Sequence, residues 1–235
     1  MRTAKRISNP GCYATSTQLL LAPLVPYIDL RAPPTVFGVS GYSGAGTVFA
    51  NDPDGRPTTA PKVNPTDLHS GNGLRPYALT DHIHEREASV HLSRLLDHSP
   101  TDPHFARPTS DLDVETGPVA ETFLAHADKP LRVAFVPAVA AWFSGIISTA
   151  SVPLAHATQG RMGAREFRAL YEERYAGERL VKILSNGPEV GDVEGQHGWV
   201  LGGVQLHSGG ERIVAVGGLD NLLKGAATQC LQVSC

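Results

Sequence analysis

Residues 199–216 read WVLGGVQLHSGGERIVAV, and this stretch decides the fold class that the sequence predicts. Apolar and β-branched residues dominate both of its ends, which predicts two strands, Trp199–Leu206 and Arg212–Val216. No helical segment lies between them. Strands that follow each other without an intervening helix favour an antiparallel sheet.

Strands also outnumber helices in the rest of the chain. Further strands are predicted at Thr35–Ser40, Leu131–Pro137, Ile146–Pro153 and Leu180–Leu184. Apolar spacing predicts helices after Ser8, at Glu85–His98, at Ala164–Tyr175 and at about Asn221–Leu231. Because few strand–helix–strand units repeat, we predict an α+β fold with a largely antiparallel sheet.

Two stretches dense in proline, glycine and aspartate interrupt this pattern, Asn51–Pro76 and Ser99–Pro118. Such composition predicts long loops. Neither half of the chain looks complete without the other, so we interpret both stretches as insertions within one domain and not as linkers between domains.

Composition excludes several classes of function. The 235 residues are 41% hydrophobic and 18% charged, with a net charge of -3, which is typical of a globular domain and gives no basic surface for nucleic acid. No apolar run is long enough to cross a bilayer. The three cysteines, Cys12, Cys230 and Cys235, are an odd number, so we expect no disulfide framework and a reducing compartment.

Cys12 is the first candidate for chemistry. We expect Ser8 or Asn9 to cap the first helix and Pro10 to lie in its first turn. A thiol in that turn is exposed to the helix dipole and to free backbone N–H groups, which favour the reactive thiolate. A cysteine nucleophile forms and releases thioesters. The alternative is a small buried core residue.

His82 and His84 form the second candidate group. A cysteine nucleophile needs a partner base, and histidine titrates near neutrality. One alternative is that both are exposed residues at a helix start capped by Asp81. A second alternative is a metal site, because His84, Glu87 and His91 have the spacing i, i+3 and i+7 on one helical face.

The segment Gly41–Gly46 has the order G-x-x-G-x-G, the reverse of the dinucleotide fingerprint, and no βαβ unit follows it. We therefore reject it as a nucleotide site. Its backbone N–H groups, with the hydroxyls of Ser40 and Ser43, could cradle an anion such as phosphate. A plain tight turn is the alternative.

Four motifs, taken in order, resemble N-acetyl-gamma-glutamyl-phosphate reductases, in the form found in the mitochondrial branch of fungi. The motifs are Ser8-Asn9-Pro10-Gly11-Cys12-Tyr13-Ala14-Thr15, Ser40-Gly41-Tyr42-Ser43-Gly44-Ala45-Gly46, His82-Ile83-His84-Glu85-Arg86-Glu87 and Asp220-Asn221-Leu222-Leu223-Lys224-Gly225-Ala226-Ala227. The last of these also predicts a small-residue helix that packs closely against a neighbour. The match extends from Ile7 to about Gln232. Two positions depart from it, since Ile83 and Ser144 stand where the family usually has arginine.

The resemblance implies a glyceraldehyde-3-phosphate-dehydrogenase-like C-terminal catalytic domain with a largely antiparallel or mixed sheet. Residues 1–235 would form a single domain for catalysis, substrate binding and dimerisation. The helix within residues 219–235 would pack on a Rossmann domain that is absent here, because no Rossmann fingerprint precedes Cys12. NADP(H) would therefore be bound mainly by a domain that is not in this chain.

The resemblance also implies roles for individual residues. Cys12 would be the nucleophile, His82 the acid and base, and Asn221 a contact to the nicotinamide end of the cofactor. The implied substrate-binding residues are Ser40, Gly41, Ser43, Gly44, His84 and Glu87. No metal is implied. Cys12 and NADPH would convert N-acetylglutamyl 5-phosphate, through a thioester, to N-acetylglutamate 5-semialdehyde and phosphate in arginine biosynthesis.

Partners and location follow from the same resemblance. The chain would form a homo-oligomer, could belong to a longer protein with an N-terminal nucleotide-binding or kinase region, and would lie in the mitochondrial matrix, or otherwise in the cytoplasm. Without a nucleotide domain we expect the isolated chain to be inactive. The alternatives are an aspartate-semialdehyde-dehydrogenase-like enzyme and a truncated remnant without catalytic activity.

Overall fold

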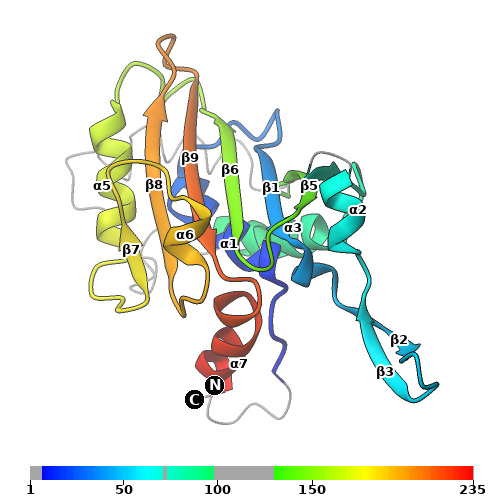
Figure 1. The fold of residues 1–235 in the computed structure, drawn as a ribbon. Helices are drawn as coiled ribbons and strands as arrows, with labels where there is room; N and C mark the ends of the chain where they lie inside the picture. The colour runs from blue at the N-terminus through cyan, green and yellow to red at the C-terminus, as the bar shows by residue number, and fades with distance from the viewer. Residues whose placement is uncertain (1–6, 71–72, 98–129, 235) are drawn as a thin grey trace.

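The computed structural model of the protein describes residues 7–70, 73–97 and 130–234. Within them, seven strands form one sheet in the order β4-β5-β1-β6-β9-β8-β7 (Figure 1). The strands are β1 (Thr35–Gly41), β4 (Leu74–Pro76), β5 (Ala134–Ala140), β6 (Ile146–Pro153), β7 (Val181–Ile183), β8 (Trp199–Leu206) and β9 (Arg212–Leu219). The pairs β1–β5 and β7–β8 are parallel and the other neighbours are antiparallel.

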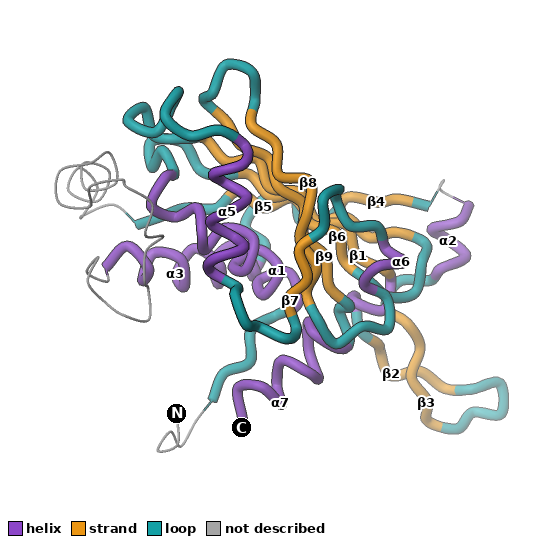
Figure 2. Tube along the Cα trace, turned by 90° about the vertical axis from the view of Figure 1, so that its left-hand side faces the viewer, coloured by secondary structure: helices purple, strands orange, loops and turns teal. Residues whose placement is uncertain are grey.

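Helices cover one face of this sheet (Figure 2). They are α1 (Cys12–Leu21), α3 (Ile83–Asp97) and α5 (Ala164–Arg174). The short helices α2 (Pro65–Ser70) and α6 (Val190–Val193) lie on the other side. A mixed, largely antiparallel sheet layered with helices confirms the predicted α+β class. None of the described helices has the length and apolar composition needed to cross a membrane.

Smaller elements connect or extend these layers. The 3-10 helices are η1 (Ala22–Tyr27) and η2 (Tyr42–Ala45), and η4 (Leu223–Ala227) is a π-helical turn that leads into α7 (Thr228–Ser234). The hairpin of β2 (Thr47–Asn51) and β3 (Pro57–Pro61) and the helix α7 both extend away from the body of the domain (Figure 1).

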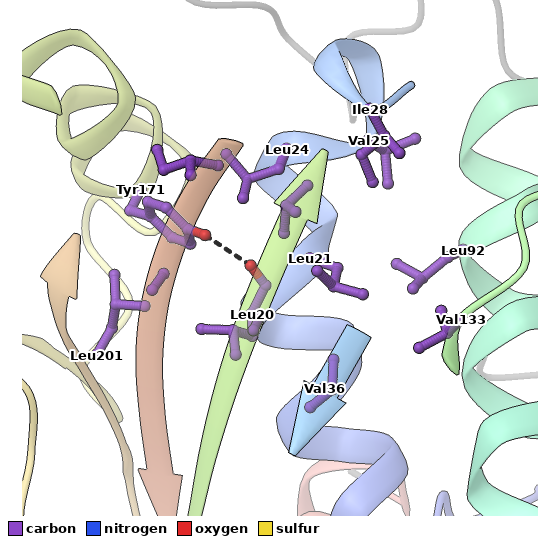
Figure 3. Close-up of a cluster of buried hydrophobic side chains, with 14 of the residues drawn as sticks. Leu20, Leu21, Leu24, Val25, Ile28, Val36, Leu92, Val133, Tyr171 and Leu201 are labelled. Carbon is purple, nitrogen blue, oxygen red and sulfur yellow. Dashed lines mark hydrogen bonds between the residues drawn. The ribbon is translucent and has the colours of Figure 1, made fainter. Parts of the chain in front are cut away.

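The core lies between the sheet and the second half of α1. Leu20, Leu21 and Leu24 have no exposed surface, and each such side chain contributes about 1.5–3 kcal/mol on burial. Tyr171 of α5 reaches into the same cluster, where its hydroxyl donates a hydrogen bond of 2.7 Å to the Leu20 carbonyl (Figure 3). This bond satisfies a buried phenol and joins α5 to the end of α1.

Alternation along β6 assigns its two faces. Ser148 faces α1, because its Oγ accepts a 3.0 Å hydrogen bond from Ser16. Ile146, Ala150 and Val152 share this buried side, and the residues between them are only partly buried. The opposite face of the sheet is therefore the more open one, as period-two alternation requires.

The sequence located most elements, and the bounds of β6 and β8 agree with the prediction. The loop predicted at Asn51–Pro76 is wrong, because this stretch contains β3, α2 and β4 as well as the end of β2. Its proline and glycine content does not favour strands, but hydrogen bonding to a partner strand stabilises them. For example, β2 pairs with β3, with Thr47 opposite Pro61. The stretch Ser99–Pro118 lies outside the described residues.

Two predictions about helix ends are also wrong. Gly11 is the N-cap of α1, which has no side-chain cap, and Asn9 instead donates to the Ala226 carbonyl. The predicted helix Asn221–Leu231 is interrupted by the π-helical turn η4 before α7 begins. Turns of this kind occur mostly as local insertions at functional positions.

Candidate active site

A cavity of about 580 Å³ opens beside the first residue of α1. Six of the residues singled out from the sequence line it together: Cys12, Ser40, Gly41, Gly44, His82 and His84. They come from α1, from β1 and the glycine loop, and from the start of α3. The fold thus brings three of the four sequence motifs to one site.

Cys12 is a half-buried free thiol at the first helical position. Burial raises the pKa of the Cys12 thiol; the backbone N–H groups of Tyr13 and Cys12 act in the opposite direction, and the Glu87 carboxylate adds to the rise. The expectation that the helix terminus lowers this pKa is therefore not met in this chain. The helix effect is present, but loss of hydration outweighs it.

Two glycines allow close approaches to the Cys12 turn. A Cβ on Gly11 would lie 2.0 Å from Nε2 of His84, so the His84 ring packs directly against the residue before Cys12. A Cβ on Gly225 would lie 2.6 Å from the Cβ of Cys12. The small-residue motif that the sequence predicted to pack closely therefore packs against Cys12 itself.

Both histidines are neutral near pH 7. Burial and, to a smaller extent, the neighbouring His82 together lower the pKa of His84 to about 4. Burial also lowers the pKa of His82, although Glu85 opposes this shift. Nδ1 of His82 accepts a 3.2 Å hydrogen bond from the His84 backbone N–H, so the neutral His82 ring carries its proton on Nε2. Nδ1 of His84 is buried without a hydrogen-bond partner.

Glu87 lies beside the cavity and not in its lining. Its carboxylate accepts the Gly11 backbone N–H at 3.1 and 3.4 Å, which ties α3 to the turn before Cys12. The described residues contain no group of three or more His, Cys, Asp or Glu side chains arranged to hold a metal ion. The alternative of a metal site at His84, Glu87 and His91 thus finds no support there.

The glycine loop does not offer the row of backbone donors that the sequence suggested. The N–H groups of Gly41, Tyr42 and Ser43 donate to the carbonyls of Gly145, Trp142 and Phe143 at 2.9–3.1 Å, and that of Gly46 donates to Ser43. These four donors are used within the fold and cannot also bind an anion, so the cradle stays a prediction for the rest of the loop. Pairing of the loop with the 142–145 turn is the physical reason that the first three are used.

The Asn221 side chain connects the glycine loop to the 142–145 turn by two hydrogen bonds. Its Oδ1 accepts the Gly145 N–H at 2.8 Å and its Nδ2 donates to Ser43 Oγ at 2.9 Å, while only 3% of the residue is exposed. Ser144, at one of the positions without the usual arginine, is buried and donates to Asp220 at 2.9 Å. Contact of Asn221 with a nicotinamide stays a prediction.

Sequence reasoning missed three polar residues that line the cavity, Lys62, Arg75 and Tyr77. Lys62 and Arg75 lie in the stretch predicted to be a loop, where no periodic pattern pointed to them. The Tyr77 ring lies edge-on to His82, with centroids 5.8 Å apart. The one available signal was that Arg75 and Tyr77 stand a few residues before His82 in the sequence.

Comparison with known proteins agrees with this geometry. The chain matches the family "Semialdehyde dehydrogenase, dimerisation domain" over residues 12–110 and 117–221, and it belongs to that family. It is 43% identical over 229 residues to the mitochondrial protein ARG5,6 of Candida albicans, covering 97% of this chain and 20% of that protein. It is 40% identical over 228 residues to an N-acetyl-gamma-glutamyl-phosphate reductase of Xanthomonas euvesicatoria, covering 97% of this chain and 55% of that protein.

These relatives confirm the resemblance inferred from the four motifs, and the chain spans 20% to 55% of their length. Among solved structures, aspartate semialdehyde dehydrogenase II of Vibrio cholerae has a TM-score of 0.59 at 16% identity, covering 97% of this chain and 61% of that one. The enzyme of Francisella tularensis has a TM-score of 0.57 at 12% identity, covering 95% and 62%. At these identities the likeness confirms the fold alone.

Proposed function

We propose that this chain is the catalytic and substrate-binding unit of an N-acetyl-gamma-glutamyl-phosphate reductase. The observation that carries the proposal is the cavity in which Cys12, at the start of a helix, lies with two neutral histidines. The sequence relatives named as this reductase favour it over an aspartate semialdehyde dehydrogenase, whose solved structures share less than a fifth of their residues with this chain.

The proposed reaction uses Cys12 as a nucleophile that must first lose its proton. Because burial raises the pKa of the thiol, a neutral histidine has to accept that proton when the substrate arrives. Cys12 Sγ then attacks the acyl carbon of N-acetylglutamyl phosphate, the C–O bond to phosphate breaks, and a thioester remains on Cys12. When bound, NADPH supplies the hydride that reduces this thioester to the semialdehyde.

His82 has the tautomer that a proton donor in this site needs. With Nδ1 occupied by the His84 N–H, its Nε2–H is free to donate to the oxygen that becomes negative as the carbonyl is attacked. The Nε2–H would then give its proton to the Cys12 sulfur as the thiolate leaves. Ser40, Gly41 and Gly44 shape the wall on which the substrate lies. His84 and Glu87 hold the Cys12 turn.

The cofactor needs a nucleotide-binding unit outside residues 1–235. Within the described residues, the polar atoms of Asn221 are bonded to Ser43 and Gly145, so this residue can contribute only a local contact. We assign residues 1–235 to one catalytic domain and residues 219–235 to the segment that packs on the nucleotide domain. None of the described residues of α7 is buried, and Leu231 is 66% exposed, which supports a role in packing on another unit.

The open face of the sheet is proposed as the contact with a second copy of the chain. It presents half-exposed apolar side chains of adjacent strands: Phe37, Val39, Ile147, Val214 and Val216. Its assignment to a homo-oligomer follows the family's description as a dimerisation domain. Because the fungal relatives are named mitochondrial and are far longer, we also propose a mitochondrial matrix location and a longer protein with a nucleotide-binding or kinase region.

The test is the phosphate-dependent oxidation of N-acetylglutamate semialdehyde by the chain joined to a nucleotide-binding domain. Cys12→Ser should abolish turnover, and His82→Asn should lower it by roughly 10²–10⁴, the usual effect of losing a general acid and base. The matched control is His91→Asn, in the same helix but outside the cavity, which should have little effect. Equal losses in His91→Asn and His82→Asn, or activity in Cys12→Ser, would refute the proposal.

A further inference from the structure

Two exposed cationic residues, Lys62 and Arg75, are among the residues that line the Cys12 cavity. Lys62 directly follows β3, and its backbone N–H donates to the Gly46 carbonyl at 3.0 Å, which fixes it beside the glycine loop. Arg75 is the central residue of β4 and pairs with Val139, which also lines the cavity. Both cations therefore stand on hydrogen-bonded backbone, although the sequence around them suggested a loop.

Nothing in the cavity neutralises these charges. Its lining contains no aspartate or glutamate. Some other basic side chains of the described residues are paired, such as Arg31 with Asp29 at 2.7 Å and Arg168 with Glu172 at 2.8 Å. Within the described part of the chain, Lys62 and Arg75 have no such partner. In a protein with a net charge of -3, a cavity with two unpaired cations is suited to an anion.

Apart from the neutral Nε2–H of His82, the donors of the glycine loop considered for an anion are mostly used within the fold. The N–H groups of Gly41, Tyr42 and Ser43 are bonded within the fold, and Ile83 of the lining carries no charge. The two cationic side chains are thus the strongest anion-binding groups that the cavity offers. Arginine suits the planar, two-oxygen geometry of a carboxylate or phosphate, and lysine acts as a compact point charge.

We propose that Lys62 and Arg75 are the specificity-determining residues that hold the anionic groups of the substrate beside Cys12. The cavity would therefore select acyl phosphates that carry a second, remote carboxylate, with one anionic group for each cation. The choice of acyl phosphate rests on the proposed function. The anion preference itself does not, so it can be measured without turnover or cofactor.

The test compares two reagents on the chain alone. Iodoacetate and iodoacetamide transfer carbon to Sγ with loss of iodide, and they differ chiefly in charge. The ratio of their rates at Cys12 cancels the fraction of thiolate and reports the local potential. The exposed Cys230 serves as an internal reference. We expect the iodoacetate to iodoacetamide ratio to be higher at Cys12 than at Cys230, as read by peptide mapping after brief labelling.

The variant Lys62→Gln/Arg75→Gln should lower the ratio at Cys12 by roughly three- to tenfold, as expected for removing unit charges from a partly solvated cavity. The control Lys182→Gln removes one charge from β7, at the opposite edge of the sheet, and should leave it unchanged. Millimolar inorganic phosphate should slow iodoacetate in the wild type but not in the double variant. Equal ratios in wild type and double variant, or an equal fall in Lys182→Gln, would overturn the proposal.

A second measurement separates the two cations in the completed enzyme. In the phosphate-dependent direction, loss of the cation that holds phosphate should raise the KM for phosphate, and loss of the one that holds the carboxylate should raise the KM for the semialdehyde. Arg75→Lys should recover part of the loss in Arg75→Gln. Changes of less than twofold in both KM values would contradict the proposal even if the reductase activity itself is present.

Discussion

The two ends of α1 differ in what surrounds them. Near its C-terminal end, Leu20 and Leu21 have no exposed surface and pack among apolar side chains, whereas Gln18 and Leu19 are partly buried. The first residue, Cys12, lines a cavity, Gly225 packs against its Cβ, and the preceding Gly11 packs against the His84 ring. One end therefore packs into the apolar core, and the other carries a free thiol at the edge of a cavity.

The comparison separates stability from chemistry within a single helix. If it is correct, changes at the buried end should alter unfolding but not the reactivity of Cys12. Changes at the cavity end should alter the reactivity of Cys12, and they should lower the free energy of unfolding less than changes at the buried end. Three substitutions can sharpen or break this separation.

The largest effect is expected at the buried end. Leu20→Ala removes a fully buried side chain and should lower the free energy of unfolding by about 2–5 kcal/mol, measured by urea denaturation. The Cys12 alkylation rate of the folded protein should stay near that of the wild type. Leu231→Ala on exposed α7 is the matched control and should cost little. A cost below 1 kcal/mol in Leu20→Ala would show that this core is not the main source of stability.

An intermediate effect is expected at Gly225. In Gly225→Ala the new methyl group would lie 2.6 Å from the Cβ of Cys12, and relieving this overlap should cost about 1–3 kcal/mol. It should also push Cys12 toward the cavity, lower its burial and speed its reaction with iodoacetamide. Gly191→Ala is the control, because no atom lies within 4 Å of a Cβ at that position. Equal behaviour of the two variants would argue against a clamp on Cys12.

The smallest effect concerns pH. The pKa of His84 falls from an ordinary 6.5 to about 4 on folding, so the unfolded chain binds the proton more readily. The contribution of neutral His84 to the free energy of unfolding is therefore complete above about pH 6.5, and it is lost as the pH falls toward 4. Since His84 is only partly buried, we expect a loss of about 1–2 kcal/mol over this window. His82 acts in the same direction.

Urea unfolding at pH 7.5 and at pH 4.5 measures this loss. The difference between the two pH values should be smaller in His84→Asn than in the wild type, because that variant has no proton to take up at position 84. The control is His156→Asn, at an exposed position with no ion pair among the described residues, and it should keep the wild-type pH dependence. An identical dependence in His84→Asn would show that the ring is solvated in solution.

Local pattern was sufficient for much of the architecture. The bounds of β6 and β8 and the helical spacing of α5 were readable because side chains alternate or recur where one face is buried. The motifs identified Cys12, His82 and the glycine loop as candidate site residues, and Cys12, His82 and residues of this loop line one cavity. Short strands within Asn51–Pro76 were not readable, because pairing with distant segments stabilises them more than their own composition does.

Only the tertiary structure decided the electrostatics of the site. Helix position alone predicts a lowered pKa for Cys12, whereas the burial that raises it depends on segments such as α3 and η4 that pack around it. The bond between Gly11 and Glu87 joins residues 76 apart in sequence, and the glycine-loop N–H groups are consumed by the 142–145 turn. Lys62 and Arg75 likewise reach the cavity through strand pairing. The hydration and the hydrogen bonds of a group depend on which distant segments pack around it, and local sequence patterns do not specify those segments.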